Sequence, residues 1–314
     1  MRPAGITIAV KKVKPLAIGY YVLTDLLARR SFRAAPMAQS ADQPVEQAVD
    51  YVESAFATIL DHSGLTPDEL AGARVLELGP GDNLGLALRF LAAGAECVVT
   101  LDKFSVPRDA AHEAAIYRAL LARLEPVERD RAEAALGNGR FDPERLRPVT
   151  GLSIEEAAGA LEPDSFDLIV SVAVLEHVYD PDAALRAMDR LLRPGGSMLH
   201  QIDFRDHTMF TAAGSHPLTF LTVSPRVWSL MSKHTGRPNR RLAGWWRDRL
   251  TALGYEVRVT VTDVLPELER ADQLAAIRPR LSREFRDLPD RELTTAGAFV
   301  AAGKPAQADL RSTY

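Results

Sequence analysis

The chain has 314 residues, of which 46% are hydrophobic and 25% charged, so it can bury a large core and is not an intrinsically disordered protein. Its 38 Lys and Arg residues are balanced by 42 Asp and Glu residues, which excludes the basic excess of a nucleic-acid-binding protein. The single cysteine, Cys97, excludes an intramolecular disulfide and a cysteine metal cluster.

The first 40 residues read as an extension without a secretory signal, so we expect a cytoplasmic protein. Residues 15–27 are apolar but too short to span a bilayer, and they contain Asp25. A cap or dimer helix that packs on protein, compatible with a homo-oligomer, is favoured over a helix lying on an anionic membrane. The basic residues that flank this stretch leave the membrane alternative open: Lys11, Lys12, Lys14, Arg29, Arg30 and Arg33.

Helical periodicity begins after a proline-bracketed linker at residues 34–44. Apolar residues recur at helical spacing over residues 45–60, and residues 66–69 resemble the N-cap, proline and acidic first turn of a second helix. We therefore assign residues 1–70 to an N-terminal extension and helical cap, and residues 71–314 to the main domain.

From Arg74 onward, short apolar runs alternate with helical patterns, which predicts a doubly wound, mostly parallel α/β sheet of seven strands. Residues 104–146 and 204–239 are too long for ordinary connections, so we expect two insertions that close over the site at the carboxyl ends of the strands. The expected strands are residues 75–78, 96–101, 148–150, 166–172, 197–202, 255–261 and 296–301.

A glycine turn follows the first expected strand and opens a helix. Gly79 and Gly81 let the backbone pass close to a ligand, and the free amides at the start of the helix face that ligand. The third glycine is Gly85, whereas the dinucleotide fingerprint would place it at Leu84. The spacing therefore disfavours a nicotinamide cofactor.

Asp102 ends the second expected strand, at the distance from the glycine turn where an acidic residue meets a ribose diol. A strand-terminal aspartate also commonly caps the next turn. The combination with the glycine turn favours the ribose interpretation.

The fourth expected strand runs into Leu175-Glu176-His177, and a crossover helix then leads to the Pro194-Gly195-Gly196 turn before the fifth. Together with the glycine turn and Asp102, these segments resemble the motif regions of class I S-adenosylmethionine-dependent methyltransferases, particularly the bacterial small-molecule enzymes. The resemblance covers roughly residues 73–203.

This resemblance implies which residues hold S-adenosylmethionine. Gly79, Pro80 and Gly81 would pass under its methionine part, and Glu77 would support that loop and the amino group. Asp102 would hold the ribose hydroxyls.

The resemblance implies a second set of contacts around the cofactor. Lys103 would lie beside the ribose, and Ser171 and Val172 would lie near the methionyl group. Many relatives have an acidic residue for the adenine after the third strand, but this chain has Leu152 and Ser153 there, and these would line the adenine pocket.

If the acceptor is a hydroxyl, a base must remove its proton, and the candidates are His177, His200, Asp203 and His207. Residues 200–207 follow the fifth strand and allow three interpretations. They contact substrate or supply the base, they form a hydrogen-bonded hinge, or they bind a divalent metal through Asp203, Asp206 and a histidine. We favour the first interpretation and rank the metal last.

Residues 239–246 combine basic side chains with two tryptophans, which suits either an anionic or sugar-like acceptor or a helix packed on the sheet. We expect O-methylation of a polar small molecule of natural-product or sugar-like type, with N-methylation as the alternative. An NAD-dependent oxidoreductase is opposed by the glycine spacing. A catalytically silent cofactor-binding module is opposed by the joint presence of Glu77, Asp102 and His177.

Overall fold

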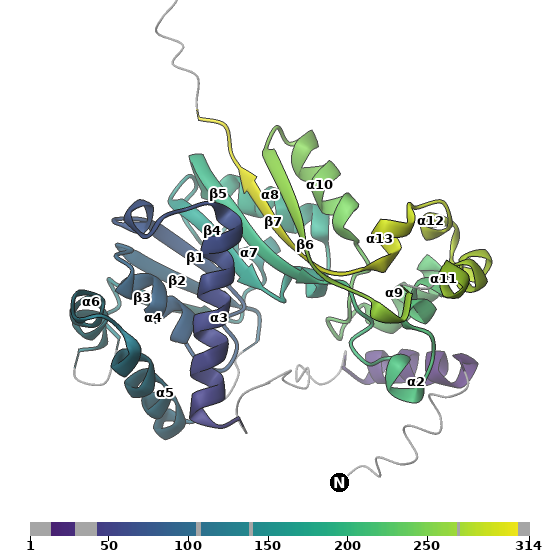
Figure 1. The fold of residues 1–314 in the computed structure, drawn as a ribbon, viewed down its shortest axis with the longest axis horizontal. Helices are drawn as coiled ribbons and strands as arrows, with labels where there is room; N and C mark the ends of the chain where they lie inside the picture. Colours follow the sequence, from purple (N-terminus) through teal and green to yellow (C-terminus); the bar gives the residue numbers. More distant parts are fainter. Residues whose placement is uncertain (1–13, 29–42, 105–107, 138–140, 269–270, 307–314) are drawn as a thin grey trace, which may run out of the picture.

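A seven-stranded sheet in the order β3-β2-β1-β4-β5-β7-β6 forms the centre of the molecule (Figure 1). The computed structural model describes residues 14–28, 43–104, 108–137, 141–268 and 271–306. The strand pairs are parallel except for the two that β7 makes with β5 and β6, which confirms the predicted doubly wound fold. The strands are β1 Arg74–Leu78, β2 Cys97–Asp102, β3 Leu146–Thr150, β4 Phe166–Val172, β5 Leu192–Asp203, β6 Glu256–Val264 and β7 Thr295–Gly303.

One face of the sheet is covered by α3 (Val45–Ser63), α4 (Gly85–Ala92), α5 (Ala110–Arg123) and α6 (Pro126–Leu136). Alternation along the strands turns Val75, Val98 and Val170 into this core. The apolar stripe of α3 meets them through its buried side chains, Ala48, Val49, Val52, Ala55, Phe56 and Ile59.

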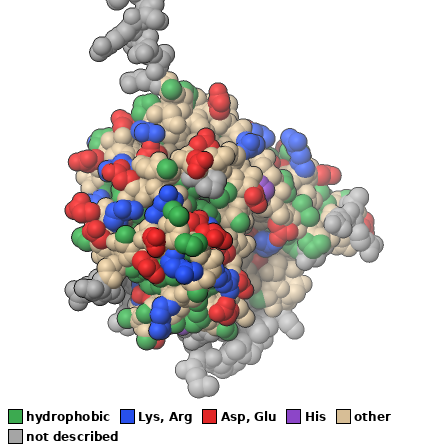
Figure 2. All heavy atoms as spheres, turned by 60° about the vertical axis from the view of Figure 1, so that its left-hand side comes forward, with side chains coloured by type: hydrophobic (Ala, Val, Ile, Leu, Met, Phe, Trp, Pro, Cys, Tyr) green, Lys and Arg blue, Asp and Glu red, His purple; other side chains and the backbone are tan. Residues whose placement is uncertain are grey.

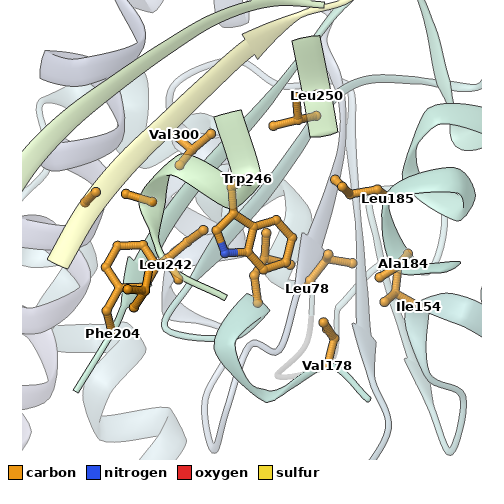
Figure 3. Packing of buried hydrophobic residues seen from close by; sticks show 14 of the residues in the cluster. Leu78, Ile154, Val178, Ala184, Leu185, Phe204, Leu242, Trp246, Leu250 and Val300 are labelled. Atoms are coloured by element: carbon orange, nitrogen blue, oxygen red, sulfur yellow. The ribbon is translucent and has the colours of Figure 1, made fainter. Parts of the chain in front are cut away.

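The opposite face is covered by α7 (Ile154–Ala157), α8 (Pro181–Leu191) and α10 (Ala243–Ala252). Trp246 of α10 is fully buried there, and its indole nitrogen donates a hydrogen bond to the Arg241 carbonyl. Figure 3 shows this indole among apolar side chains that include Leu78 of β1 and Val300 of β7. Trp246 is thus a core residue that holds α10 on the sheet.

The second N-terminal helix that we predicted is a single 3-10 turn, η1 (Pro67–Leu70). Its start is as expected, because Thr66 and Glu69 form a capping box around a proline. The predicted length is wrong, since the chain turns at Gly72, which has a φ of 77°, and enters β1 two residues later.

Helix α2 (Lys14–Ala28) packs beside α9 (Pro225–Ser232), away from α3 (Figure 1). Its buried residues, Ala17, Tyr21 and Asp25, are four positions apart and form one face. Leu16 and Leu23, on the rest of the helix, are more than half exposed. Among the described residues, no helix is long and apolar enough to cross a membrane.

The remaining short helices lie mainly after β5 and between β6 and β7. They are η2 Leu175–His177, η3 Thr211–Ala213, η4 Pro217–Thr222, η5 Pro266–Leu268, α11 Ala271–Ile277, η6 Arg278–Arg280, α12 Arg283–Arg286 and α13 Asp290–Thr294. Acidic and basic side chains are interspersed on the face drawn in Figure 2, in line with the balanced composition.

Candidate active site

A pocket of about 310 Å³ opens at the carboxyl ends of β1, β2 and β4. On one side it is lined by the glycine turn after β1 and by the end of β2, which we call the glycine-turn half (Glu77, Gly79, Pro80, Gly81 and Asp102). On the other side it reaches the histidine half, which we define as Glu176, His177 and His207, the last two of which line the pocket. Two chemically different regions therefore share one cavity.

The three glycines of the turn serve different purposes. Gly79 has a φ of 64°, and a Cβ there would lie 2.5 Å from Cγ2 of Val174, so both conformation and space demand glycine. Gly81 has a φ of 73° but faces open space. A Cβ at Gly85 would lie 2.7 Å from a methyl group of Val52, so this glycine lets α4 pack against α3.

Glu77 is a buried carboxyl group on the wall of the pocket. Its residue is 4% exposed, and its Oε2 has no hydrogen-bond partner. Burial raises the pKa of Glu77 to about 8, and the guanidinium of Arg108 opposes part of that rise. Because a buried carboxylate without a partner is costly, this position suits a cationic group of a ligand.

Asp102 ends β2 and lines the same wall. Its Oδ1 accepts a hydrogen bond from the backbone N–H of Phe104 at 2.8 Å, so it does cap the next turn. Burial raises the pKa of Asp102, although this hydrogen bond counteracts the rise. The second carboxylate oxygen leaves a hydrogen-bond acceptor for a ligand hydroxyl.

Leu152 and Ser153, with Lys103, line the pocket beyond Asp102. The hydroxyl and the backbone N–H of Ser153 both donate to Glu156 Oε2, in the capping box of α7. Ser153 therefore forms a wall of the pocket with its donors already in use. Val172 lines the pocket from the end of β4.

Ser171 and His200 lie outside the pocket lining, in contrast to the positions that the sequence suggested. Both are buried within the sheet, and Ser171 Oγ lies 2.7 Å from His200 Nδ1. Burial lowers the pKa of His200 to about 3. The alternation along β5 predicted which face His200 occupies, but not that neighbouring elements cover that face. We therefore do not retain this pair as candidates for contact with a ligand.

His177 ends the η2 turn after β4 and faces the pocket. Its Nδ1 lies 2.7 Å from the Gly236 carbonyl oxygen, which can only accept, so Nδ1 carries the proton. The Nε2 atom of the neutral ring then presents its lone pair, and it is buried without a partner. Burial, together with His207, lowers the pKa of His177 to about 4.

His207 reaches the pocket from a strained loop after β5. His207 and Thr208 have φ values of 48° and 62°, a conformation that non-glycine residues rarely adopt. The Asp206 carboxylate holds the loop by accepting hydrogen bonds from the backbone N–H groups of Thr208, Phe210 and Thr211. The His207 ring consequently meets the His177 ring edge to face, with centroids 4.7 Å apart.

The carboxylates of the metal alternative, Asp203 and Asp206, are already engaged. Asp206 organises the His207 loop, and Asp203 accepts the backbone N–H of Arg205 and forms an ion pair with its guanidinium. Neither aspartate lines the pocket. Both side chains thus serve the local loop, which favours the hinge interpretation of residues 200–207 for these two aspartates.

Glu176 is the carboxylate that the structure brings to the histidines instead. It is 2% exposed, and its Oε1 lies 3.9 Å from His207 Nε2 and accepts a 3.4 Å hydrogen bond from the backbone N–H of Asp203. Its Oε2 is buried without a partner, and burial raises its pKa to about 8. The Leu-Glu-His segment contains this signal, but the sequence alone assigns a role only to its histidine.

A family model described as a methyltransferase domain matches residues 24–258. The chain belongs to this methyltransferase family. The match spans both halves of the pocket, so the protein is an enzyme with a Rossmann-like methyltransferase fold.

Curated relatives include ubiquinone biosynthesis O-methyltransferases. The protein from Xanthomonas euvesicatoria pv. vesicatoria is 34% identical over 130 residues, which are 41% of this chain and 43% of that protein. The protein from Roseobacter denitrificans is 27% identical over 190 residues, which are 58% and 62% of the two chains. The chain therefore matches less than two thirds of the length of these relatives.

Comparison with solved structures also finds methyltransferases. An S-adenosylmethionine-dependent methyltransferase from Mesorhizobium loti is 20% identical, with 83% of this chain and 100% of that chain covered and a TM-score of 0.43. Phosphoethanolamine N-methyltransferase 2 from Haemonchus contortus, in complex with S-adenosyl-L-methionine, is 15% identical, with 86% and 59% covered and a TM-score of 0.47.

Other residues of the methyltransferase pocket had not been predicted. Tyr51 of α3 lines it, as do Thr235 and Gly236 from the end of the second insertion. The side chain of Asn239 donates to the carbonyl of Leu175 and so holds the η2 turn. These residues come from distant segments, and no local pattern in the sequence marks them.

The two insertions contribute unequally to the methyltransferase pocket. Of the described residues in the first, Phe104 lines the pocket, whereas α5 and α6 pack against α3 and α4. The second contributes His207, Thr235 and Gly236. The second insertion is therefore the one that shapes the histidine half.

The basic and aromatic segment at residues 239–246 is structural. The Arg240 guanidinium donates to the carbonyls of Phe220 and Val223 and pairs with Glu284. Trp246 is in the core, as described above. Of the two interpretations that we left open, the structure favours packing on the sheet.

Proposed function

We propose that this methyltransferase transfers the methyl group of S-adenosylmethionine to a hydroxyl oxygen of a polar small molecule, of natural-product or sugar-like type. The observation that carries the proposal is the single pocket joining the glycine-turn half to the histidine half. The O-methyltransferase names of the curated relatives support an oxygen acceptor.

The glycine-turn half fits S-adenosylmethionine group by group. The unpartnered Oε2 of Glu77 would pair with the ammonium group, and Asp102 would accept hydrogen bonds from the ribose hydroxyls. Phe104 and Leu152 would provide apolar contact for the adenine. When bound, this cofactor supplies a methyl group on a sulfonium, from which a neutral thioether departs as a good leaving group.

The histidine half fits a hydroxyl acceptor. A hydroxyl group is neutral near pH 7, so the attacking oxygen must lose its proton as it reacts. Nε2 of His177 has a lone pair that no protein group uses, and His207 and Glu176 lie beside it. Val174 and Val178 line the same part of the pocket and would exclude water from the acceptor.

Binding and transfer can be tested separately. Calorimetry on the full chain should show one site for S-adenosylmethionine and for S-adenosylhomocysteine, and no response to NAD. Incubation of the enzyme with methyl-labelled cofactor and hydroxyl-bearing small molecules, each paired with an amine analogue, should label the hydroxyl compounds. Binding of NAD alone would overturn the cofactor assignment, and labelling confined to amines would overturn the oxygen acceptor.

A further inference from the structure

We propose that Glu176, His177 and His207 form a binding site for one divalent transition-metal ion, of the kind represented by Zn²⁺. Each residue offers one ligand atom, and these atoms all lie within 4.8 Å of one another. Among the described residues, no other group of three carboxylate or imidazole side chains converges in this way. The site rests on geometry alone, and only its role in catalysis depends on the function proposed above.

Three buried polar atoms of this cluster have no hydrogen-bond partner. They are Glu176 Oε2, His177 Nε2 and His207 Nε2. Buried polar atoms in folded proteins nearly always have a partner, so three such atoms in one cluster indicate a shared ligand. A water molecule can donate only two hydrogen bonds, whereas a cation can accept a lone pair from all three atoms.

The contact that holds the His177 ring is typical of a metal ligand. A metal-binding histidine usually donates its other ring N–H to a carboxylate or backbone carbonyl, which fixes the ring and its tautomer. His177 makes this contact with the Gly236 carbonyl at 2.7 Å. The site would therefore receive the Nε2 lone pair of His177 without any change of tautomer.

The loop that carries His207 is strained. Two consecutive non-glycine residues, His207 and Thr208, are held in the left-handed conformation by the Asp206 carboxylate. Such strain costs free energy and is concentrated at functional sites. Here its result is to bring the His207 ring against His177 and Glu176, deep in the pocket.

The donor set selects the class of metal. Two imidazole nitrogens and one carboxylate are common ligands of Zn²⁺ and similar ions, whereas Mg²⁺ and Ca²⁺ prefer oxygen ligands. Three protein ligands leave a coordination position open toward the pocket. The site thus resembles a catalytic metal centre more than a closed structural one.

The open position gives the metal a role in the proposed methyl transfer. A hydroxyl that coordinates a divalent cation loses its proton to water more readily, because the positive charge stabilises the oxyanion. That oxygen then forms a bond to the methyl carbon while the carbon–sulfur bond breaks. The bonding electrons remain on sulfur, which becomes an uncharged thioether.

Metal binding can be measured by a spectroscopic titration that does not depend on enzyme activity. The full chain, stripped with a chelator, is titrated with Co²⁺ while visible absorption is recorded, and Zn²⁺ is then added in competition. We expect one Co²⁺ per chain, displaced by Zn²⁺ but not by an equal concentration of Mg²⁺. Glu176→Gln and His207→Asn should each weaken Zn²⁺ binding by more than about tenfold, since even supporting contacts of metal ligands contribute 10- to 100-fold.

The matched control is His62→Asn, which alters a histidine of α3 that packs on Phe299 and does not line the pocket. It should bind Zn²⁺ like the wild type, and circular dichroism establishes that each variant is folded. Absence of stoichiometric binding, or equal affinity in folded wild type, Glu176→Gln and His207→Asn, would overturn the metal site.

The metal site and the proposed function can fail independently. Labelled methyl transfer by a chain that binds no metal would contradict the metal site and leave the function intact. Stoichiometric Zn²⁺ binding by a chain that does not bind S-adenosylmethionine would support the site and contradict the function.

Discussion

The two halves of the pocket are built in different ways. The glycine-turn half comes from two adjacent strands, β1 and β2, and its residues lie within a short stretch from Glu77 to Asp102. The histidine half combines the η2 turn with the loop after β5. His177 is held there by its hydrogen bond to the carbonyl of Gly236, at the end of the second insertion. One half follows from local sequence, and the other exists only in the assembled fold.

The N-terminal helix α2 also supports the histidine half. The buried Asp25 of α2 accepts hydrogen bonds from the backbone N–H of His234 and from the Thr235 hydroxyl, next to the carbonyl that holds His177. Because the two halves are built differently, we expect them to bind different ligands. Under the function proposed above, the local half would bind a cofactor shared by many enzymes, and the assembled half an acceptor particular to this one.

Loss of the His177 ring should separate turnover from cofactor binding. His177→Asn should lower turnover by about 10²- to 10⁴-fold, because the group beside the acceptor hydroxyl is lost. Its affinity for S-adenosylmethionine should stay unchanged, since Glu77 and Asp102 are intact. Steady-state kinetics and calorimetry on the same preparation measure both quantities. Equal loss of affinity and turnover would show that the two halves are not separable.

In contrast to His177→Asn, Asp102→Ala should lower the affinity for the cofactor. Loss of the ribose hydrogen bonds should weaken S-adenosylmethionine binding by about 1.5 to 3 kcal/mol, the range for hydrogen bonds to charged groups. The matched control is Asp109→Ala, which removes the N-cap of α5 outside the pocket lining. Calorimetry should find the control's affinity unchanged, and an unchanged affinity in folded Asp102→Ala would remove Asp102 from the site.

A pair of glycine variants tests how closely the turn approaches the pocket wall. Both Gly79→Ala and Gly81→Ala place a side chain in the left-handed region, at a cost of roughly 1–2 kcal/mol. Only Gly79→Ala also pushes into Val174. Thermal unfolding should therefore show a larger loss of stability for Gly79→Ala, and equal losses would contradict the geometry described for Val174.

The sequence predicted most of the fold and much of the glycine-turn half, for a physical reason. Strand periodicity, the glycine turn and Asp102 are local signals, because the chain itself carries the spacing. His200 was misplaced because alternation gives the face of a strand but not what covers it. Glu176 was overlooked because its significance depends on His207, which lies 31 residues later in the chain and which only the fold brings close.

Cofactor binding should also depend on pH through Glu77. The pKa of about 8 means that Glu77 is mostly protonated in the free protein at pH 7, and pairing with an ammonium group requires its ionisation. Affinity should therefore fall as pH is lowered below 8, by at most about tenfold per unit. Calorimetry from pH 6 to pH 8.5 should show this trend in the wild type and lose it in Glu77→Gln.

The same raised pKa has a consequence for stability. The pKa of Glu77 in the folded protein lies above its pKa in the unfolded chain. The contribution of Glu77 to stability is therefore present at acidic pH and is lost as pH rises toward and through 8. Glu77→Gln should therefore stabilise the cofactor-free protein at pH 8 relative to the wild type. Thermal unfolding at pH 6 and pH 8 tests this, and an identical pH response of the two proteins would contradict it.

In the proposed enzyme, one pocket joins a separate cofactor site and acceptor site. Calorimetric titration of the wild type, Asp102→Ala and His177→Asn with S-adenosylmethionine, under identical conditions, tests it most directly. We predict one site in the wild type, the same affinity in His177→Asn, and an affinity lower by about 1.5 to 3 kcal/mol in Asp102→Ala. No binding to the wild type, or equal binding to all three proteins, would contradict the claim.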